Sequence, residues 1–283
     1  ATSHGFLGSY LGSRHGVSAT AIAGKGTGME RDYDGDSKVY GADLRDPESI
    51  GREAGERAVR RLNPGRLPTG RGTVVFDPRL ASSLVGHLLG AINGAAIARR
   101  TSFLQNALGT ALFAPSIRIT DDPRRPRGLA SRPFDGEGVA AEPMDLVAGG
   151  VLQTWLLDSA TARELGLETN GRGSGGGGSP HATNVTLLPG TLSPEELLAE
   201  IGEGLYVTEL IGHGVNGVTG DYSRGASGFW IEKGKLAWPV SGITVAGNLK
   251  DMFLNMTPAN DQQFKSSTNA PTVRIEGMTV AGS

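Results

Sequence analysis

A histidine close to two hydroxyl side chains is the first feature of this sequence that could carry chemistry. Ser82, Ser83 and His87 lie in the segment SSLVGH, which directly precedes the apolar run 88–98. A catalytic zinc site usually needs three protein ligands, an open fourth position and a carboxylate that acts on the bound water. His87 has no His, Asp or Glu within five residues on either side. Serine hydroxyls do not replace such ligands.

The apolar residues around His87 have the spacing of a core helix. Leucine, isoleucine or alanine recurs every four residues at positions 84, 88, 92 and 96. That period places them on one face of a helix, which must be buried against other elements. From the residues alone, His87 is therefore a structural, hydrogen-bonded histidine, and the chain has no self-contained catalytic site.

Glu209 and His213 form a second candidate pair, because residues four apart share one face of a helix. Glycines at 212, 214 and 217 argue against a helix there, so metal binding is the weaker interpretation. No serine lies in a G-x-S-x-G nucleophile elbow. The glycine segments 24–26 and 171–173 are too short to be phosphate loops.

Two charged segments have simple interpretations. Residues 32–36 (DYDGD) resemble half of a calcium loop but lack the closing glutamate, so they predict a solvated turn. Residues 121–138 combine four arginines with Asp and Glu residues and contain no aromatic platform for bases. This segment predicts a surface loop with internal ion pairs rather than a nucleic-acid site.

The composition excludes several classes of function. There is no cysteine, so disulfides and thiolate metal sites are ruled out, and a cytoplasmic location is expected. The 27 basic and 29 acidic residues give a net charge of −2, which provides no field to attract nucleic acid or an anionic membrane. No apolar run reaches the ~20 residues of a membrane helix. The chain begins without methionine or a visible signal peptide, and we expect a missing upstream segment.

Helix and turn signals predict an α+β fold with many strands. Short alternating runs in residues 5–29 predict antiparallel strands. Asp46-Pro47 starts a helix that extends to about residue 62, and Asp77-Pro78 starts the helix that carries His87. The other predicted elements are strands at 73–76, 151–157, 273–276 and 278–280, helices at 159–165 and 193–203, and a hairpin around Lys233-Gly234.

These elements divide the chain near residue 64. Residues 1–65 are predicted to be a truncated N-terminal sheet-plus-helix domain, and residues 66–283 a strand-rich, barrel-like or sandwich domain with packed helices. The tract 173–179 (GSGGGGS) has no means of forming a core. It is either an engineered linker or a natural glycine-rich loop.

Four segments together resemble one known family. They are 212–232 (GHGVNGVTGDYSRGASGFWIE), 246–253 (AGNLKDMF), 275–280 (IEGMTV) and 131–138 (SRPFDGEG). The chain closely resembles the TldE/PmbA branch of the TldD/PmbA metalloprotease family over almost its whole length, apart from the glycine tract. The resemblance favours the barrel-like form of the second domain.

The resemblance also implies a role for the opening segment. TldD-type subunits carry an HExxxH zinc motif on a helix and a further cysteine ligand near the C-terminus. Laid on this sequence, the motif puts Ser82 at the first histidine, Ser83 at the glutamate and His87 at the second histidine. Residues 261–270 contain no cysteine. The resemblance therefore implies a non-catalytic subunit with no metal or cofactor of its own.

Such a subunit is expected to pair with a TldD-like partner, as a heterodimer or a higher assembly, with zinc in the partner. The expected substrates are unfolded or short peptides, with roles in microcin-type precursor maturation and antitoxin turnover. The alternative is a stand-alone homodimeric binding protein that modulates DNA gyrase without proteolysis. Direct nucleic-acid or membrane binding is not expected, because the charges balance.

Overall fold

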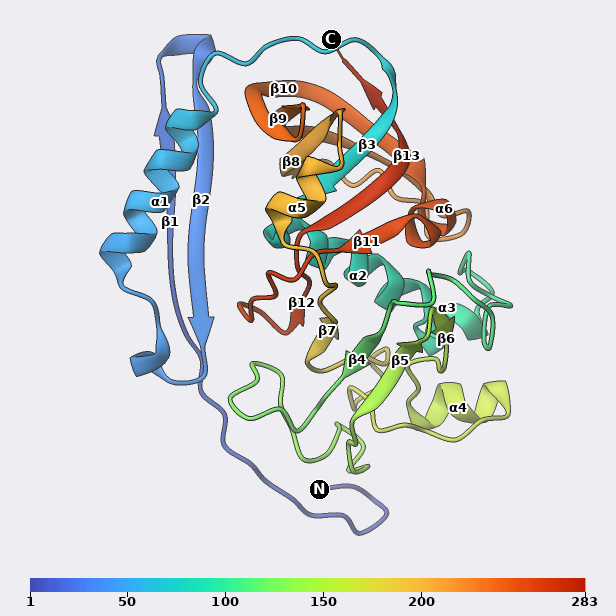
Figure 1. Ribbon diagram of the computed structural model, residues 1–283. Coiled ribbons are helices and arrows are strands. Elements are labelled where there is room, and N and C mark those ends of the chain that lie inside the picture. Colours follow the sequence, from blue (N-terminus) through green and yellow to red (C-terminus); the bar gives the residue numbers. More distant parts are fainter. Residues whose placement is uncertain (283) are drawn as a thin grey trace.

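The computed structural model describes residues 1–282, and its N-terminal unit is a two-stranded hairpin covered by one helix (Figure 1). Strands β1 (His15–Ala23) and β2 (Glu30–Lys38) pair antiparallel, and α1 (Pro47–Arg60) packs against both. Short 3-10 turns occupy Gly26–Gly28 and Gly41–Asp43. Helix α1 begins where the sequence predicts, because the Asp46 carboxylate accepts hydrogen bonds from the backbone N–H groups of Glu48 and Ser49.

The acidic segment 32–36 belongs to strand β2, so the prediction of a solvated turn is wrong. Asp32, Asp34 and Asp36 alternate along the strand, and each is at most 4% exposed. Arginines distant in sequence pair with Asp32 and Asp34 (Arg79 and Arg45, respectively). Buried carboxylates persist where they are paired and hydrogen-bonded, and these partners allow a turn-like sequence to form a strand.

Five strands form a closed barrel in the larger unit (Figure 1). They are β3 (Gly70–Phe76), β8 (Glu203–Ile211), β9 (Asp221–Glu232), β10 (Lys235–Asn248) and β13 (Val273–Ala281). Their order is β10-β9-β8-β3-β13, and pairing of β10 with β13 closes the ring. Only β3 and β8 are parallel. The predicted α+β, barrel-like architecture is confirmed.

The ends of the barrel strands carry short elements. Lys233 (φ 51°) and Gly234 (φ 76°) make the tight left-handed turn between β9 and β10, as the sequence predicts. Helix α6 (Leu249–Leu254) follows β10, and β11 (Met256–Pro258) pairs with β13. Helix α5 (Pro194–Ala199) ends before the predicted residue 203, because Ile201 and Gly202 accept hydrogen bonds from the β9–β10 turn.

A second sheet lies beside the barrel, with strand order β12-β7-β4-β5-β6 (Figure 1). Its strands are β4 (Ile119–Asp121), β5 (Met144–Ala148), β6 (Val151–Leu152), β7 (Val185–Leu187) and β12 (Thr268–Asn269). Helices α3 (Gly94–Ala98) and α4 (Ser159–Leu165) pack together next to it. The predicted strand 151–157 is wrong beyond Leu152, because Leu156 turns to bond with Ile92. The glycine tract 173–179 lies in the connection between α4 and β7.

Helix α2 (Pro78–Ala91) is the central element of the core (Figure 1). Leu84 and Leu88 are fully buried in one cluster with Val74 of the barrel and Val185 of the second sheet. The four-residue apolar period thus correctly predicts the buried face of this helix. Among the described residues, no helix is both long and apolar enough to cross a membrane.

Candidate functional site

Ser82 and Ser83 sit in the second turn of α2, with their hydroxyls bonded to the helix itself. The Ser83 hydroxyl donates to the carbonyl of Leu80 at 2.6 Å, and the Ser82 hydroxyl donates to the carbonyl of Arg79 at 3.4 Å. Such bonds to the preceding turn are typical of serines inside helices. Neither side chain is arranged as a metal ligand or a proton acceptor.

His87 lies one turn beyond Ser83 and packs against an aromatic ring. Its imidazole and the Tyr222 ring form an edge-on pair with centroids 5.9 Å apart. Burial, and secondarily the positive charge of Arg224, lower the pKa of His87, so the ring is neutral near pH 7. Its buried Nε2 has no hydrogen-bond partner among the described residues. The predicted structural histidine is thus packed, but the expected hydrogen bond to this nitrogen is missing.

Glu209 and His213 do not share a helix face. Glu209 lies in strand β8, where Arg31 donates to its carboxylate at 3.1 Å and Arg61 at 2.5 Å. His213 is exposed in the glycine-rich loop that follows. The argument from the glycines against a helix is confirmed. The weaker interpretation of the pair as metal ligands finds no support, because both carboxylate oxygens of Glu209 already bind arginines.

A zinc ion of the kind found in metallopeptidases does not fit these residues. Over residues 1–282, no group of three or more His, Asp or Glu side chains is arranged to hold a metal. Ser82 and Ser83 bond to their own helix, and the Nε2 atom of His87 is buried beside Tyr222. The helix that would carry such a site serves instead as a core element.

One serine–histidine pair was not found from the sequence. The Ser174 hydroxyl lies 2.8 Å from Nδ1 of His181, and Arg132 donates to Nε2 of the same ring at 2.7 Å. Because arginine only donates, Nε2 is the acceptor and Nδ1 carries the proton that is donated to Ser174. The Ser174 proton is directed to the carbonyl of Ser179. Burial and the charge of Arg132 lower the pKa of His181. The lone pair of its unprotonated Nε2 already accepts the hydrogen bond from Arg132, so the ring cannot take a proton from Ser174.

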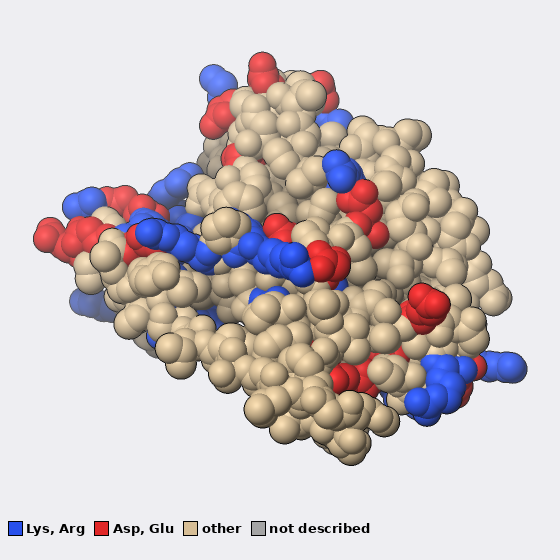
Figure 2. All heavy atoms as spheres, turned by 90° about the horizontal axis from the view of Figure 1, so that it is seen from below, with Lys and Arg blue, Asp and Glu red and all other residues tan. Residues whose placement is uncertain are grey.

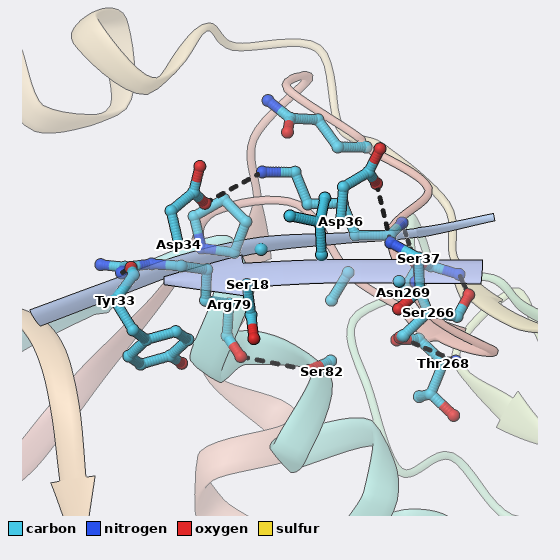
Figure 3. Close-up of a pocket in the computed structure, with 17 residues that line it drawn as sticks. Ser18, Tyr33, Asp34, Asp36, Ser37, Arg79, Ser82, Ser266, Thr268 and Asn269 are labelled. Carbon is cyan, nitrogen blue, oxygen red and sulfur yellow. Dashed lines mark hydrogen bonds and ion pairs between the residues drawn. The ribbon is translucent and has the colours of Figure 1, made fainter. Parts of the chain in front are cut away.

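A cleft between the N-terminal hairpin and the larger unit is a candidate binding site (Figure 3). Residues 16–18 and 33–37 of the hairpin, the start of α2 and residues 263–270 enclose about 400 Å³. Ser82 borders this space. Figure 3 shows Ser18 and Tyr33 on the side of the hairpin that faces Ser82, with Asp34 and Asp36 on the opposite side. The sequence does not predict this cleft, because its walls come from three distant segments.

The cleft is bordered by a network of ion pairs. Nη1 of Arg79 donates to Asp32 at 2.7 Å and to the carbonyl of Tyr33 at 2.8 Å. Burial lowers the pKa of Arg79, but Asp77 and Asp32 more than offset this, so the pKa is raised. Burial likewise acts to raise the pKa of Asp34, but bonds from Arg45 and the charge of Arg57 outweigh it and lower the pKa. Arg79 and Asp34 therefore both stay charged near neutral pH.

The arginine-rich loop 121–138 finds most of its partners outside itself, which corrects the prediction of internal ion pairs. Arg124 pairs with Glu142, and Arg127 pairs with Asp43 next to the hairpin at 2.6 Å. Arg125 stacks on the ring of Phe264, 3.3 Å from its centroid. The loop therefore ties separate parts of the chain together.

Figure 2 shows Lys and Arg side chains in a band across one hollowed face, with acidic side chains near its ends.

Two family models match the chain in succession. The PmbA/TldA metallopeptidase central domain matches residues 1–62, and the PmbA/TldA metallopeptidase C-terminal domain matches residues 69–282. The metalloprotease PmbA of Escherichia coli O157:H7 is 42% identical over 281 residues, which cover 99% of this chain and 61% of that protein.

Solved structures agree with these matches. The crystal structure of a candidate modulator of DNA gyrase from Bacteroides thetaiotaomicron has a TM-score of 0.91 and 32% identity, covering 99% of this chain and 63% of that one. TldE from Thermococcus kodakarensis shares the fold, with a TM-score of 0.81 and 24% identity over 92% of this chain and 61% of that one. The chain spans about three fifths of the length of these relatives. It belongs to the PmbA/TldD metallopeptidase family.

Proposed function

We propose that the chain is the non-catalytic, TldE-like subunit of a heteromeric zinc peptidase. This proposal rests on the side chains of helix α2. Ser82 and Ser83 bond to carbonyls of α2 itself, and His87 is a lone imidazole packed against Tyr222. A family member without ligands or a general base depends on another subunit for hydrolysis.

In this proposal a TldD-like partner supplies the zinc and the catalytic carboxylate, in a heterodimer or a larger assembly in the cytoplasm. This chain helps to enclose unfolded or short peptides, and the cleft between the hairpin and α2 is open to such a segment. The processes it serves are maturation of microcin-type precursors and turnover of antitoxins. The chain needs no cofactor of its own.

The test compares the chain alone with the chain plus a TldD-like subunit. Zinc is measured by mass spectrometry of the metal content, and peptidase activity with a labelled, unstructured peptide. We expect less than stoichiometric zinc and no cleavage for the chain alone, and cleavage once the partner is added. Stoichiometric zinc together with peptidase activity in the isolated chain would contradict the proposal.

A stand-alone binding role is the second candidate. It is favoured by the structural relative described as a candidate modulator of DNA gyrase. In that case the chain forms a homodimer and binds a gyrase or toxin component without proteolysis. Affinity capture from cell extract separates the two: recovery of a gyrase or toxin component without any TldD-like subunit supports the second candidate and rejects the first.

A further inference from the structure

We propose that the cleft beside β2 binds an extended peptide that carries a carboxylate. The peptide adds to the free edge of β2 at Gly35, and its carboxylate binds the ammonium group of Lys265. The inference rests on the proposed function only for the class of ligand, a peptide. It concerns side chains and backbone of this chain alone and requires no zinc.

The outer edge of β2 has a free backbone position at Gly35. In an antiparallel ladder, alternate residues point both N–H and C=O away from the partner strand. The carbonyls of Arg31 and Tyr33 accept bonds from arginine side chains, so this set of residues faces away from β1. Gly35 is two residues beyond Tyr33, so its N–H and C=O also point away from β1. No other described residue bonds this N–H or C=O outside the ladder. Gly35 also lines the cleft.

The positions next to Gly35 on this edge are partly closed. The N–H of Tyr33 bonds to the Asp32 carboxylate at 2.7 Å, and the N–H of Ser37 bonds to the Asp36 carboxylate at 3.0 Å. An added strand therefore exchanges its pair of main-chain hydrogen bonds at Gly35. Strand addition takes affinity from such bonds and specificity from side-chain contacts.

The opposite wall of the cleft does not compete for a peptide strand. Strand β12 lies at the edge of the second sheet, but Ser266 closes its outer side. The Ser266 hydroxyl donates to the carbonyl of Thr268 at 2.5 Å and accepts from the N–H of the same residue at 3.2 Å. An incoming peptide therefore finds its unpaired main-chain partner on β2.

Among the described residues that line the cleft, Lys265 is the cation with donors to spare. Its Nζ lies 3.9 Å from Asp34, beyond hydrogen-bond distance, and its side chain is 31% exposed. Asp34 already accepts bonds from Arg45 at 2.6 Å and from Arg57 at 3.0 Å. Arg79 is likewise committed to Asp32 and Asp77. An ammonium group with free donors binds a carboxylate more strongly than it binds a neutral amide.

The experiment uses two short, end-blocked peptides of alternating threonine and valine that carry the same fluorophore. In one peptide the residue next to the central one is glutamate, and in the other it is glutamine. The central residue pairs with Gly35, so its side chain lies on the Tyr33 face of the hairpin, whereas Lys265 lies near Asp34 on the opposite face (Figure 3). Fluorescence anisotropy at low ionic strength measures their affinity for the chain. We expect the glutamate peptide to bind about fivefold more tightly, which is the effect of one partly exposed ion pair. Methylation of the central backbone nitrogen should abolish binding of either peptide.

Lys265→Met should remove the preference for glutamate, and Lys250→Met, which changes an exposed lysine of α6, should retain it. Circular dichroism checks that both variants are folded. Equal binding of the two peptides, a preference that survives Lys265→Met, or no binding at all would overturn the inference. Peptidase activity restored by a TldD-like partner would then still support the proposed function, whereas a retained preference without restored activity would reject only that function.

Discussion

Nη1 of Arg79 donates a hydrogen bond to the Asp32 carboxylate at 2.7 Å and thereby joins the first turn of α2 to the N-terminal hairpin. The two residues lie in the two segments that the family models match separately, residues 69–282 and 1–62. The same guanidinium lies over the Tyr33 ring, 5.1 Å from its centroid. The hairpin is therefore held against the larger unit mainly by charge and hydrogen bonds at this point, and the cleft forms where they meet.

Replacement of Arg79 should destabilise the chain strongly. Arg79→Met leaves the buried Asp32 without its closest cation, and breaking a buried pair costs about 3 kcal/mol in free energy of unfolding. Urea unfolding followed by circular dichroism measures the change. Arg118→Met is the matched control, because the Arg118–Asp145 pair is largely exposed and should leave the free energy of unfolding unchanged. Equal losses in both variants would contradict this view of the interface.

The core role of α2 predicts opposite results at adjacent positions. Leu84 is fully buried between the barrel and the second sheet, so Leu84→Ala should lower the free energy of unfolding by about 3 kcal/mol. Ser83→Ala removes a hydroxyl that only bonds back to its own helix and should cost less than about 0.5 kcal/mol. Thermal unfolding of both variants tests this. A large loss at Ser83 would indicate a function for its hydroxyl that these contacts do not explain.

His87 should make the chain less stable in mild acid. An unfolded histidine has a pKa of about 6.5, and burial lowers the pKa of His87 in the folded chain. Below the unfolded value the unfolded state binds more protons, so the free energy of unfolding falls as the pH falls through the folded pKa. His87→Phe should therefore lose less stability than the wild type between about pH 7 and about pH 5.

The measurement is urea unfolding at several pH values in that range. His213→Phe is the control, because the His213 ring is exposed and its loss should leave the pH profile of the wild type unchanged. An identical pH dependence in His87→Phe and the wild type would contradict the assignment of a buried, neutral imidazole.

The buried pair between Arg172 and Asp121 should be essential for the second sheet. Both side chains are fully buried, with Nε of Arg172 2.7 Å from the carboxylate. Arg172→Met leaves Asp121 with only its bonds from Thr183 and should cost about 4 kcal/mol. Soluble expression and urea unfolding measure the effect, and Arg163→Met on α4 provides the exposed control. A stable Arg172→Met variant would show that Thr183 alone can hold the carboxylate.

The sequence predicted the elements whose signals are local. Asp46-Pro47 and Asp77-Pro78 set the starts of α1 and α2, since a capping carboxylate and a fixed proline φ act within one helical turn. Lys233-Gly234 fixed the β9–β10 turn. Composition alone excludes thiolate chemistry, because the chain has no cysteine, and the balanced charge excludes a general field that attracts nucleic acid.

Tertiary structure decided the elements whose partners are distant in sequence. The segment 32–36 has the composition of a turn, and it becomes a strand because arginines from α1, α2 and the linkers neutralise its buried carboxylates. Helix α5 is cut short by hydrogen bonds from the β9–β10 turn to Ile201 and Gly202. The cleft at Gly35 and Lys265 has walls from three separated segments. Local propensity carries no information about such contacts, because their energies arise only when the chain brings these groups together.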